Sequence, residues 1–202
     1  MSVVKIYEQG CSDFIVGELG ADGFGDTSKK INGVMEIEMD LTEELGKISA
    51  DNDPAFIKIK GPARGTGTIR LTAVPIDDYQ LLTSALVGAN KVIAIGEHTA
   101  VAERGFSFKK EQFDNATKST NLIMVHKVTF GIPNEGSTSI DEDGIEIVEC
   151  EIPFECHPAF YEEGSVRKRR TITKINSAKS SALYDTLKNK CFTPDEAELT
   201  TT

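Results

Sequence analysis

The residues of this chain that are best suited to chemistry are its cysteines and histidines, and their spacing favours neither a catalytic nor a metal site. Cys150, Cys156 and His157 are close in sequence, but paired zinc ligands are normally about two to four residues apart. Cys150 also falls in an alternating segment typical of a strand, so a buried thiol is the better interpretation. None of the three histidines, His98, His126 and His157, lies beside a recognisable nucleophile elbow. The pattern does not indicate a hydrolytic triad.

Three loops rich in glycine or aspartate also lack the pattern of a ligand site. Gly61–Thr68 lacks the lysine of a phosphate loop, and Thr68 begins a predicted strand rather than a helix. Asp51–Asp53 and Asp141–Gly144 do not continue with the ligand spacing of a calcium loop, and both are typical of turns. We therefore expect a protein that is not an enzyme and that holds no cofactor and no metal.

The composition predicts one ordinary domain rather than several. The chain has 202 residues, 39% of them apolar, and no tryptophan, so its core must be built from aliphatic side chains and ten phenylalanines. The formal charge of −10 argues against a free-standing nucleic-acid binder. We find no secretion signal and no apolar run of the roughly 20 residues that a membrane helix requires. We expect a protein made in the cytoplasm, with reduced cysteines and no membrane partner.

Most periodic segments alternate with a period of two, which is typical of strands with one buried face. One face of Val34–Leu41 is apolar, formed by Met35, Ile37, Met39 and Leu41. Its other face is acidic, formed by Glu36, Glu38 and Asp40. Similar alternation predicts strands over residues 47–50, 55–60, 68–74, 91–95, 105–109, 122–130, 145–154 and 166–175. The predicted fold class is mainly β, a sandwich or barrel with one or two helices.

Turn and helix signals divide this β framework. The sequence Asp51-Asn52-Asp53-Pro54 predicts a turn, so Lys47–Lys60 is expected to be a hairpin, followed by an irregular connection over residues 61–67. A packed helix is predicted over about residues 77–87, begun by a capping box of Asp77 and Gln80 and stopped by Gly88. A weaker second helix is predicted over residues 178–191, with a mobile tail from Phe192. We expect a single β domain over residues 1–176 and a C-terminal extension over 177–202.

A basic run, Arg167-Lys168-Arg169-Arg170, stands out against the acidic background. Positive charge on an exposed edge strand discourages stray pairing. Alternatively, the run docks against an acidic surface of a neighbouring copy of the chain. Nucleic-acid binding ranks third, because no aromatic residues interleave the charges. The first two interpretations stay open at the level of sequence.

One ordered set of segments resembles a known family. It begins with Val34–Leu41 and Ser49–Pro54, continues through a glycine-rich connection to Thr66–Tyr79 and a short helix, and ends with Asn121–Val128, Gly144–Phe154 and Glu155–Pro158. This order resembles the major tail tube proteins of long, non-contractile bacteriophage tails, particularly those of phages that infect Gram-positive bacteria. The resemblance covers roughly residues 30–165, and the segment from Gly164 to Thr202 departs from it.

The resemblance implies a structural virion protein of the phage tail tube fold, with a long hairpin arm. Its subunits would form stacked hexameric rings whose inner sheets join around a channel for DNA ejection, with genomic DNA passing through without specific binding. A tape measure protein and a tail terminator would be its other partners. The protein would be assembled in the host bacterial cytoplasm and would be located in the tail tube of the virion. The alternative is another virion ring or decoration protein, such as a tail completion or head decoration protein, with a similar β fold.

Three groups of residues are the candidate contact sites under this resemblance. Carboxylates repel phosphates, so Glu36, Glu38 and Asp40 are candidates for the channel wall; the open alternative is that they face solvent or another subunit. The candidate arm between rings is Ser49, Ala50, Asp51, Asn52, Asp53, Pro54, Ala55 and Phe56. The basic run Arg167–Arg170 is the candidate subunit contact.

Overall fold

The computed structural model describes residues 6–21, 23–24, 28–50, 53–83, 86–87, 92–94, 102–114, 117–134, 149–163 and 165–198. Of residues 44–50 and 53–59, only the backbone is described. The predicted strands 91–95 and 145–154 lie partly outside these ranges. His98, Asp51, Asn52 and the predicted turn Asp141–Gly144 lie wholly outside them.

The described chain is mainly β, as predicted, with three short helices. The strands of the main sheet are β1 (Ile6–Glu18), β2 (Lys29–Lys30), β3 (Val34–Ala50), β4 (Asp53–Leu71), β7 (Arg104–Asp114), β8 (Thr117–Phe130), β9 (Cys150–Cys156) and β12 (Ile172–Asn176). Two small sheets are formed by β5 (Leu86–Val87) with β6 (Ile93–Ala94) and by β10 (Ala159–Glu163) with β11 (Val166–Arg170). The helices are α1 (Ile76–Thr83), α2 (Ser181–Leu187) and α3 (Pro194–Glu198).

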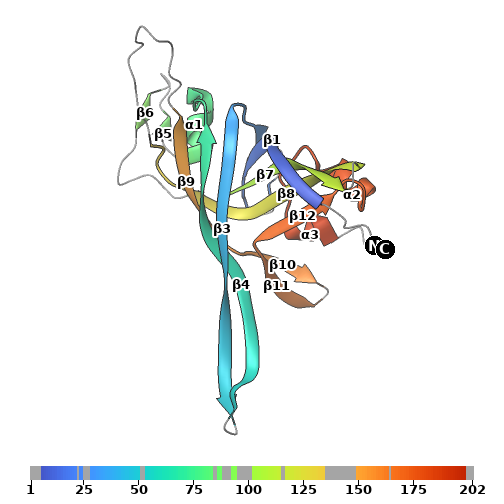
Figure 1. The fold of residues 1–202 in the computed structure, drawn as a ribbon. Coiled ribbons are helices and arrows are strands. Elements are labelled where there is room, and N and C mark those ends of the chain that lie inside the picture. The colour runs from blue at the N-terminus through green and yellow to red at the C-terminus, as the bar shows by residue number, and fades with distance from the viewer. Residues whose placement is uncertain are drawn as a thin grey trace, which may run out of the picture.

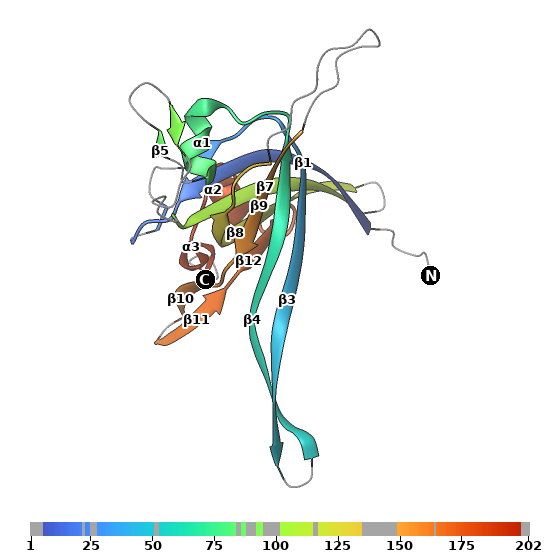
Figure 2. The same ribbon diagram turned by 90° about the vertical axis from the view of Figure 1, so that its left-hand side faces the viewer.

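The main sheet is antiparallel in the order β2-β1-β7-β8-β9-β4-β3 and branches at β8. One edge of β8 pairs with β7, while the other pairs first with β12, opposite residues 121–125, and then with β9, opposite residues 128–130. The partner changes at His126 and Lys127, whose backbone bonds go to Thr171 and His157. In both ribbon views β3 and β4 stand upright across β1, β7 and β8, which the branch makes possible (Figures 1 and 2).

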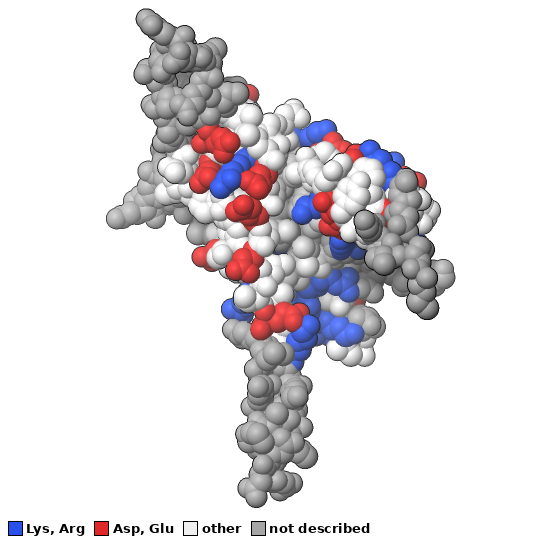
Figure 3. All heavy atoms as spheres, in the orientation of Figure 1, with Lys and Arg blue, Asp and Glu red and all other residues white. Residues whose placement is uncertain are grey.

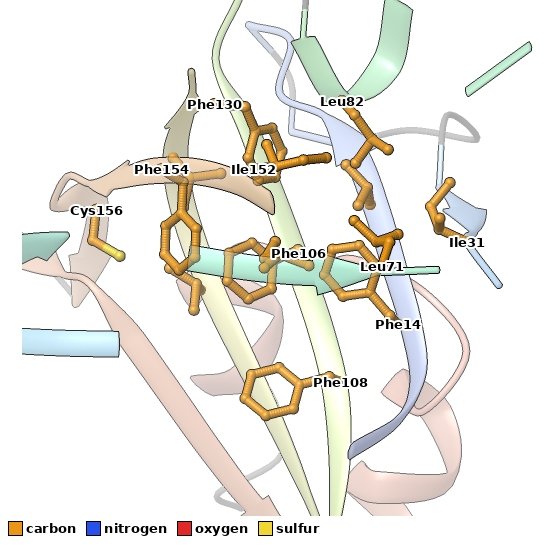
Figure 4. Close-up of a cluster of buried hydrophobic side chains, with 14 of the residues drawn as sticks. Phe14, Ile31, Leu71, Leu82, Phe106, Phe108, Phe130, Ile152, Phe154 and Cys156 are labelled. Atoms are coloured by element: carbon orange, nitrogen blue, oxygen red, sulfur yellow. The ribbon is translucent and has the colours of Figure 1, made fainter. Parts of the chain in front are cut away.

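The main hydrophobic core fills the angle between the two parts of the sheet. Phe106 of β7 lies at its centre, with its ring centroid 5.5 Å from that of Phe14 and 5.2 Å from that of Phe154 (Figure 4). Leu82 of α1 closes one end of this core and is fully buried. Buried aromatic pairs of this kind stabilise a core beyond the area that they bury. Seven of the ten phenylalanines are buried, so phenylalanine supplies the large aromatic side chains of a core that has no tryptophan.

A second core lies on the opposite face of β1, β7 and β8. It joins Leu122 and Met124 of β8 to Leu187, Cys191 and Phe192 of the C-terminal segment. The prediction of a mobile tail from Phe192 is wrong, because that side chain has 0% of its surface exposed. Helix α2 is shorter than the predicted 178–191. The C-terminal segment up to residue 198 therefore packs on the β domain.

The first part of β3 follows the predicted alternation with one exception. Val34, Ile37, Met39 and Leu41 pack against the main core. The predicted inward side chain of Met35 is instead 49% exposed. A register shift between Val34 and Glu36 against β4 explains the difference, because a bulged residue breaks the alternation of faces.

Strand β4 runs without interruption through residues 61–67, so the predicted irregular connection is wrong. Its glycines are explained by close packing: a Cβ on Gly65 would lie 1.9 Å from the Asp40 carbonyl oxygen, and one on Gly67 would lie 2.3 Å from that of Glu38. The glycines therefore permit close approach of two strands rather than a loop. The predicted short hairpin is the end of one long β3–β4 hairpin.

Three further elements differ from the sequence prediction: helix α1, strand β1 and the predicted strand 166–175. Helix α1 begins at Ile76 and ends at Thr83, short of the expected residue 87, and Leu86 belongs to β5. Strand β1, which the sequence analysis did not predict, supplies Phe14 and Val16 to the main core and Ile15 to the second one. The predicted strand 166–175 is divided at Thr171 into β11 and β12, which belong to different sheets.

Candidate functional site

The acidic side of β3 forms part of a larger exposed face. Glu36, Glu38 and Asp40 are all exposed, as the alternation predicts. In register with them, β4 presents Arg70, Thr68 and Thr66, and the next strand, β9, presents Glu151, Pro153 and Glu155. We call the surface formed by these nine residues the acidic face (Figure 3).

Arg70 is the one cation of the acidic face, and it joins three strands. Its Nη1 donates to Glu36 Oε2 at 2.8 Å and its Nε donates to Glu151 Oε1 at 2.9 Å. The hydrogen bond to Glu151, the charges of Glu151 and Glu36, and the more distant charge of Glu38 raise the pKa of Arg70. Within the described part of the chain, Glu38 and Asp40 have no cationic partner. Five carboxylates against one guanidinium leave the face strongly negative.

The acidic face continues to an open edge. Strand β3 is the last strand of the sheet order, and β4 is its only partner among the described residues. From Thr42 to Ala50 it pairs with β4 in a hairpin that extends well beyond the body of the molecule (Figures 1 and 2). The candidate arm residues Ser49, Ala50, Asp53, Pro54, Ala55 and Phe56 lie at the end of this hairpin.

The basic run lies on β11 and is interleaved with aromatic rings from β10. The guanidinium carbons of Arg167 and Arg169 lie 4.0 Å and 4.8 Å from the ring centroid of Phe160, which is 48% exposed. Arg170 lies 4.5 Å from the ring centroid of Tyr161 and donates to its hydroxyl at 3.1 Å. The sequence argument that no aromatic residue accompanies these charges is wrong, because the partners lie across the hairpin rather than along the run.

Beside this hairpin the surface is hollowed. The hollow has a volume of about 520 Å³ and is lined by Arg64, Glu103, Lys127, Thr129, His157, Pro158, Phe160 and Arg169; we call it the basic hollow. Lys127 pairs with Glu103 at 2.5 Å, and His157 is within 3.3 Å of the Thr129 hydroxyl. In the view of Figure 3, acidic side chains gather in the upper left part of the described surface, and a group of lysines and arginines lies below them.

Two of the described cysteines, Cys156 and Cys191, are buried in the two cores. Burial raises the pKa of the Cys156 thiol to about 11 and that of Cys191 to about 12, which makes both poor nucleophiles. Among the residues that the structure describes, no three His, Cys, Asp or Glu side chains are grouped so that they would hold a metal ion. None of the described helices is long and apolar enough to cross a membrane.

The comparisons with known proteins leave the family open. No protein-family model matches the chain, and a search of curated proteins finds no match. The function must therefore be argued from the surfaces themselves.

Sequence reasoning found only part of these surfaces. It identified Glu36, Glu38 and Asp40 but missed Glu151, which lies in the predicted strand 145–154, and Glu155, which lies just beyond that strand as predicted but within β9. Their common face with β3 depends on the strand order, which alternation alone does not give. The role of Phe160 was missed for the same reason, since it contacts Arg167 and Arg169 only through the β10–β11 register.

Proposed function

We propose that this chain is a structural virion protein, the tail tube protein of a long-tailed bacteriophage, whose copies form stacked hexameric rings around a channel. One observation carries the proposal: a strongly acidic sheet face continues to an open edge strand, and that strand extends into an arm beyond the body. The ordered segments that resemble the tail tube family include both the acidic strand and the tip of this arm.

The open edge supports self-assembly. An exposed edge strand presents unpaired backbone donors and acceptors, which monomeric proteins usually cover or interrupt. The part of β3 that bears Glu36, Glu38 and Asp40 pairs with β4 on one side only among the described residues. Pairing with a neighbouring copy satisfies these groups and, repeated with closed symmetry, makes a ring.

The acidic face supports a role as a conduit. DNA carries a dense negative charge, and lysine or arginine contacts would hold it by counterion release. A wall on which five carboxylates outnumber one arginine repels the polymer and leaves it free to slide. Arg70 does not reverse this effect, because Glu36 and Glu151 both pair with it. In the proposed tube this face lines the lumen.

The β3–β4 arm is the proposed contact between rings. Its backbone pairing continues as far as Ala50 and Asp53, so the arm is a hydrogen-bonded ribbon rather than a loose loop. In the virion its partners would be further copies of the chain, with the tape measure protein inside the tube and the terminator at its end. A ring that never stacks would instead favour a tail completion or head decoration protein.

Shortening the arm tests this proposal. Ile48 and Ile57 are cross-strand partners, so residues 49–56 are replaced by the turn Asn-Gly, which closes two-residue hairpins well. The shortened chain is expected to remain folded by circular dichroism but to form no tubes in negative-stain images. A matched control keeps the full arm and places the same turn at its tip, as Asp51→Asn with Asn52→Gly. If the shortened and control chains form tubes of the same length, the arm is not the contact between rings.

A further inference from the structure

We propose that the basic hollow and the adjoining Arg167 receive the acidic segment 135–148 of a second copy of this chain. The inference rests on the proposed function and deepens it, because it names a second contact, besides the arm, between copies that meet end to end. It concerns the end of the subunit rather than the acidic face or the arm.

Three arginines at this site lack local partners, although Lys127 is paired with Glu103. Among the described residues, Arg64, Arg167 and Arg169 have no carboxylate within ion-pair distance, whereas most other described lysines and arginines are paired. Examples of such pairs are Lys109 with Asp13, Arg104 with Glu18 and Lys190 with Glu196. In a chain with a net charge of −10, carboxylates are plentiful. Three unpaired arginines on one surface therefore indicate a partner from outside the subunit.

The arginines are also held in position for a partner. Arg167 and Arg169 lie against the Phe160 ring, which limits the rotamers that binding would have to fix. Arg64 lines the hollow from β4, and Lys127 and His157 also line it. Guanidinium groups bind carboxylates in paired hydrogen bonds, so this arrangement suits a peptide with several carboxylates.

The segment between β8 and β9 has the complementary sequence. It comprises residues 135–148, and these 14 residues include no lysine or arginine. They include five carboxylates, Glu135, Asp141, Glu142, Asp143 and Glu146. The charge of this segment is therefore opposite to that of the arginines at the basic hollow, as interfaces between copies require.

The hollow and the point where the segment rejoins the described chain lie at different levels of β4. Arg64 lies in the middle part of β4 and lines the hollow, whereas Leu71 at the end of that strand pairs with Cys150, directly after Glu149. Seven residues of strand separate them, about 23 Å. A 14-residue segment anchored at both ends must run out and back, about 46 Å in all, to reach Arg64 of its own subunit, which is close to its fully extended length. A second copy placed head to tail is therefore the occupant that fits. This direction is that of the arm (Figures 1 and 2).

A binding measurement tests the inference without requiring tubes. A fluorescein-labelled peptide of residues 135–149 is titrated with the full-length protein at low salt, and its fluorescence anisotropy is followed. Arg167→Glu with Arg169→Glu is expected to weaken binding at least tenfold. The control, Lys118→Glu with Lys179→Glu, makes the same change in net charge away from the hollow and is expected to weaken it less than twofold. Peptide with Asp141→Asn, Glu142→Gln and Asp143→Asn should bind at least tenfold less tightly.

Circular dichroism melting shows whether the Arg167 and Arg169 variant is folded, and Arg169→Gln supplies a milder change if it is not. The inference is overturned if the wild-type chain does not bind the peptide, or if the hollow variant and the control bind it equally. Tighter binding of a single-stranded oligonucleotide than of the peptide also overturns it, since nucleic acid is then the preferred occupant. If the peptide binds as expected while the concentrated protein forms no tubes, the docking site stands and the tube function fails.

Discussion

His126 of β8 and Phe192 of the C-terminal segment are joined by a hydrogen bond from the imidazole Nδ1 to the Phe192 carbonyl oxygen, 3.0 Å long. Because a carbonyl only accepts, Nδ1 carries the proton. Nε2 then accepts from the Thr173 hydroxyl at 2.6 Å. Both ring nitrogens are satisfied in the neutral imidazole, and the side chain is fully buried. The pair ties the C-terminal segment to the strand at which the sheet branches.

This pairing predicts loss of stability in mild acid. Burial, opposed by the Phe192 hydrogen bond, lowers the pKa of His126 from 6.5 to about 4. Between these values the unfolded chain binds the proton and the folded chain does not, so the free energy of unfolding falls as the pH falls from 6.5 to 4. The gap corresponds to about 3 kcal/mol. Urea denaturation at a series of pH values measures it.

The matched variant for this measurement is His126→Gln, which does not titrate. Its free energy of unfolding at pH 7 is expected to be lower than that of the wild type, but its decline between pH 6.5 and 4 is expected to be shallower. The pKa of Asp13 is lowered by its hydrogen bonds to Lys109 and Lys30. The stability that this carboxylate contributes is present above its ordinary pKa of 3.8 and is lost as the pH falls below that value, in both chains alike. Parallel pH profiles for the two chains would contradict the assignment.

Phe192→Ala tests whether the C-terminal segment belongs to the folded body. The ring is fully buried against the second core and lies edge-on to His126, with centroids 5.7 Å apart. Its removal is expected to lower the free energy of unfolding by about 3–5 kcal/mol. Phe160→Ala, on the exposed hairpin, is the control and is expected to cost about 1 kcal/mol or less. A small effect at Phe192 would restore the interpretation as a loose tail.

Gly67→Ala tests the close approach of β3 and β4. The added methyl group would lie 2.3 Å from the Glu38 carbonyl oxygen and 2.4 Å from the Phe154 ring, so one strand or the ring must shift. Thermal unfolding is expected to show a loss of about 1–3 kcal/mol. Thr68→Ala, on the outward side of the next position, is expected to change stability by about 0.5 kcal/mol. Equal effects of the two variants would mean that the glycine is not required.

The alternation of apolar and polar residues correctly predicted the exposure of side chains that depends on one strand alone. It failed where exposure depends on how that strand pairs with its neighbours. The exposed positions of Glu36, Glu38 and Asp40 follow from a period of two. The exposure of Met35 does not, because it results from a bulge against β4. In the sequence, Gly65 and Gly67 indicate a loop. In the structure they lie within β4, where the β3 backbone at Asp40 and Glu38 leaves no room for a Cβ atom.

The ends of the chain were hardest to predict because their structure is set by tertiary packing. Residues 6–12 of β1 are largely exposed, and residues 14–16 are buried on both faces, so neither part alternates. The residues around Phe192 have weak helix propensity and many polar neighbours, yet Leu122, Met124 and Cys191 bury the ring. The candidate contact surfaces were predicted one strand at a time, and their extension to Glu151, Glu155 and Phe160 required the strand order.

The most direct test of the proposed tube is electron microscopy of the purified protein as it is concentrated. The account predicts hollow tubes of stacked rings in which the side chains of Glu36, Glu38 and Asp40 line the lumen of the reconstructed density. Particles that remain single at every concentration, or a lumen lined by Arg167 and Arg169 instead, would contradict it.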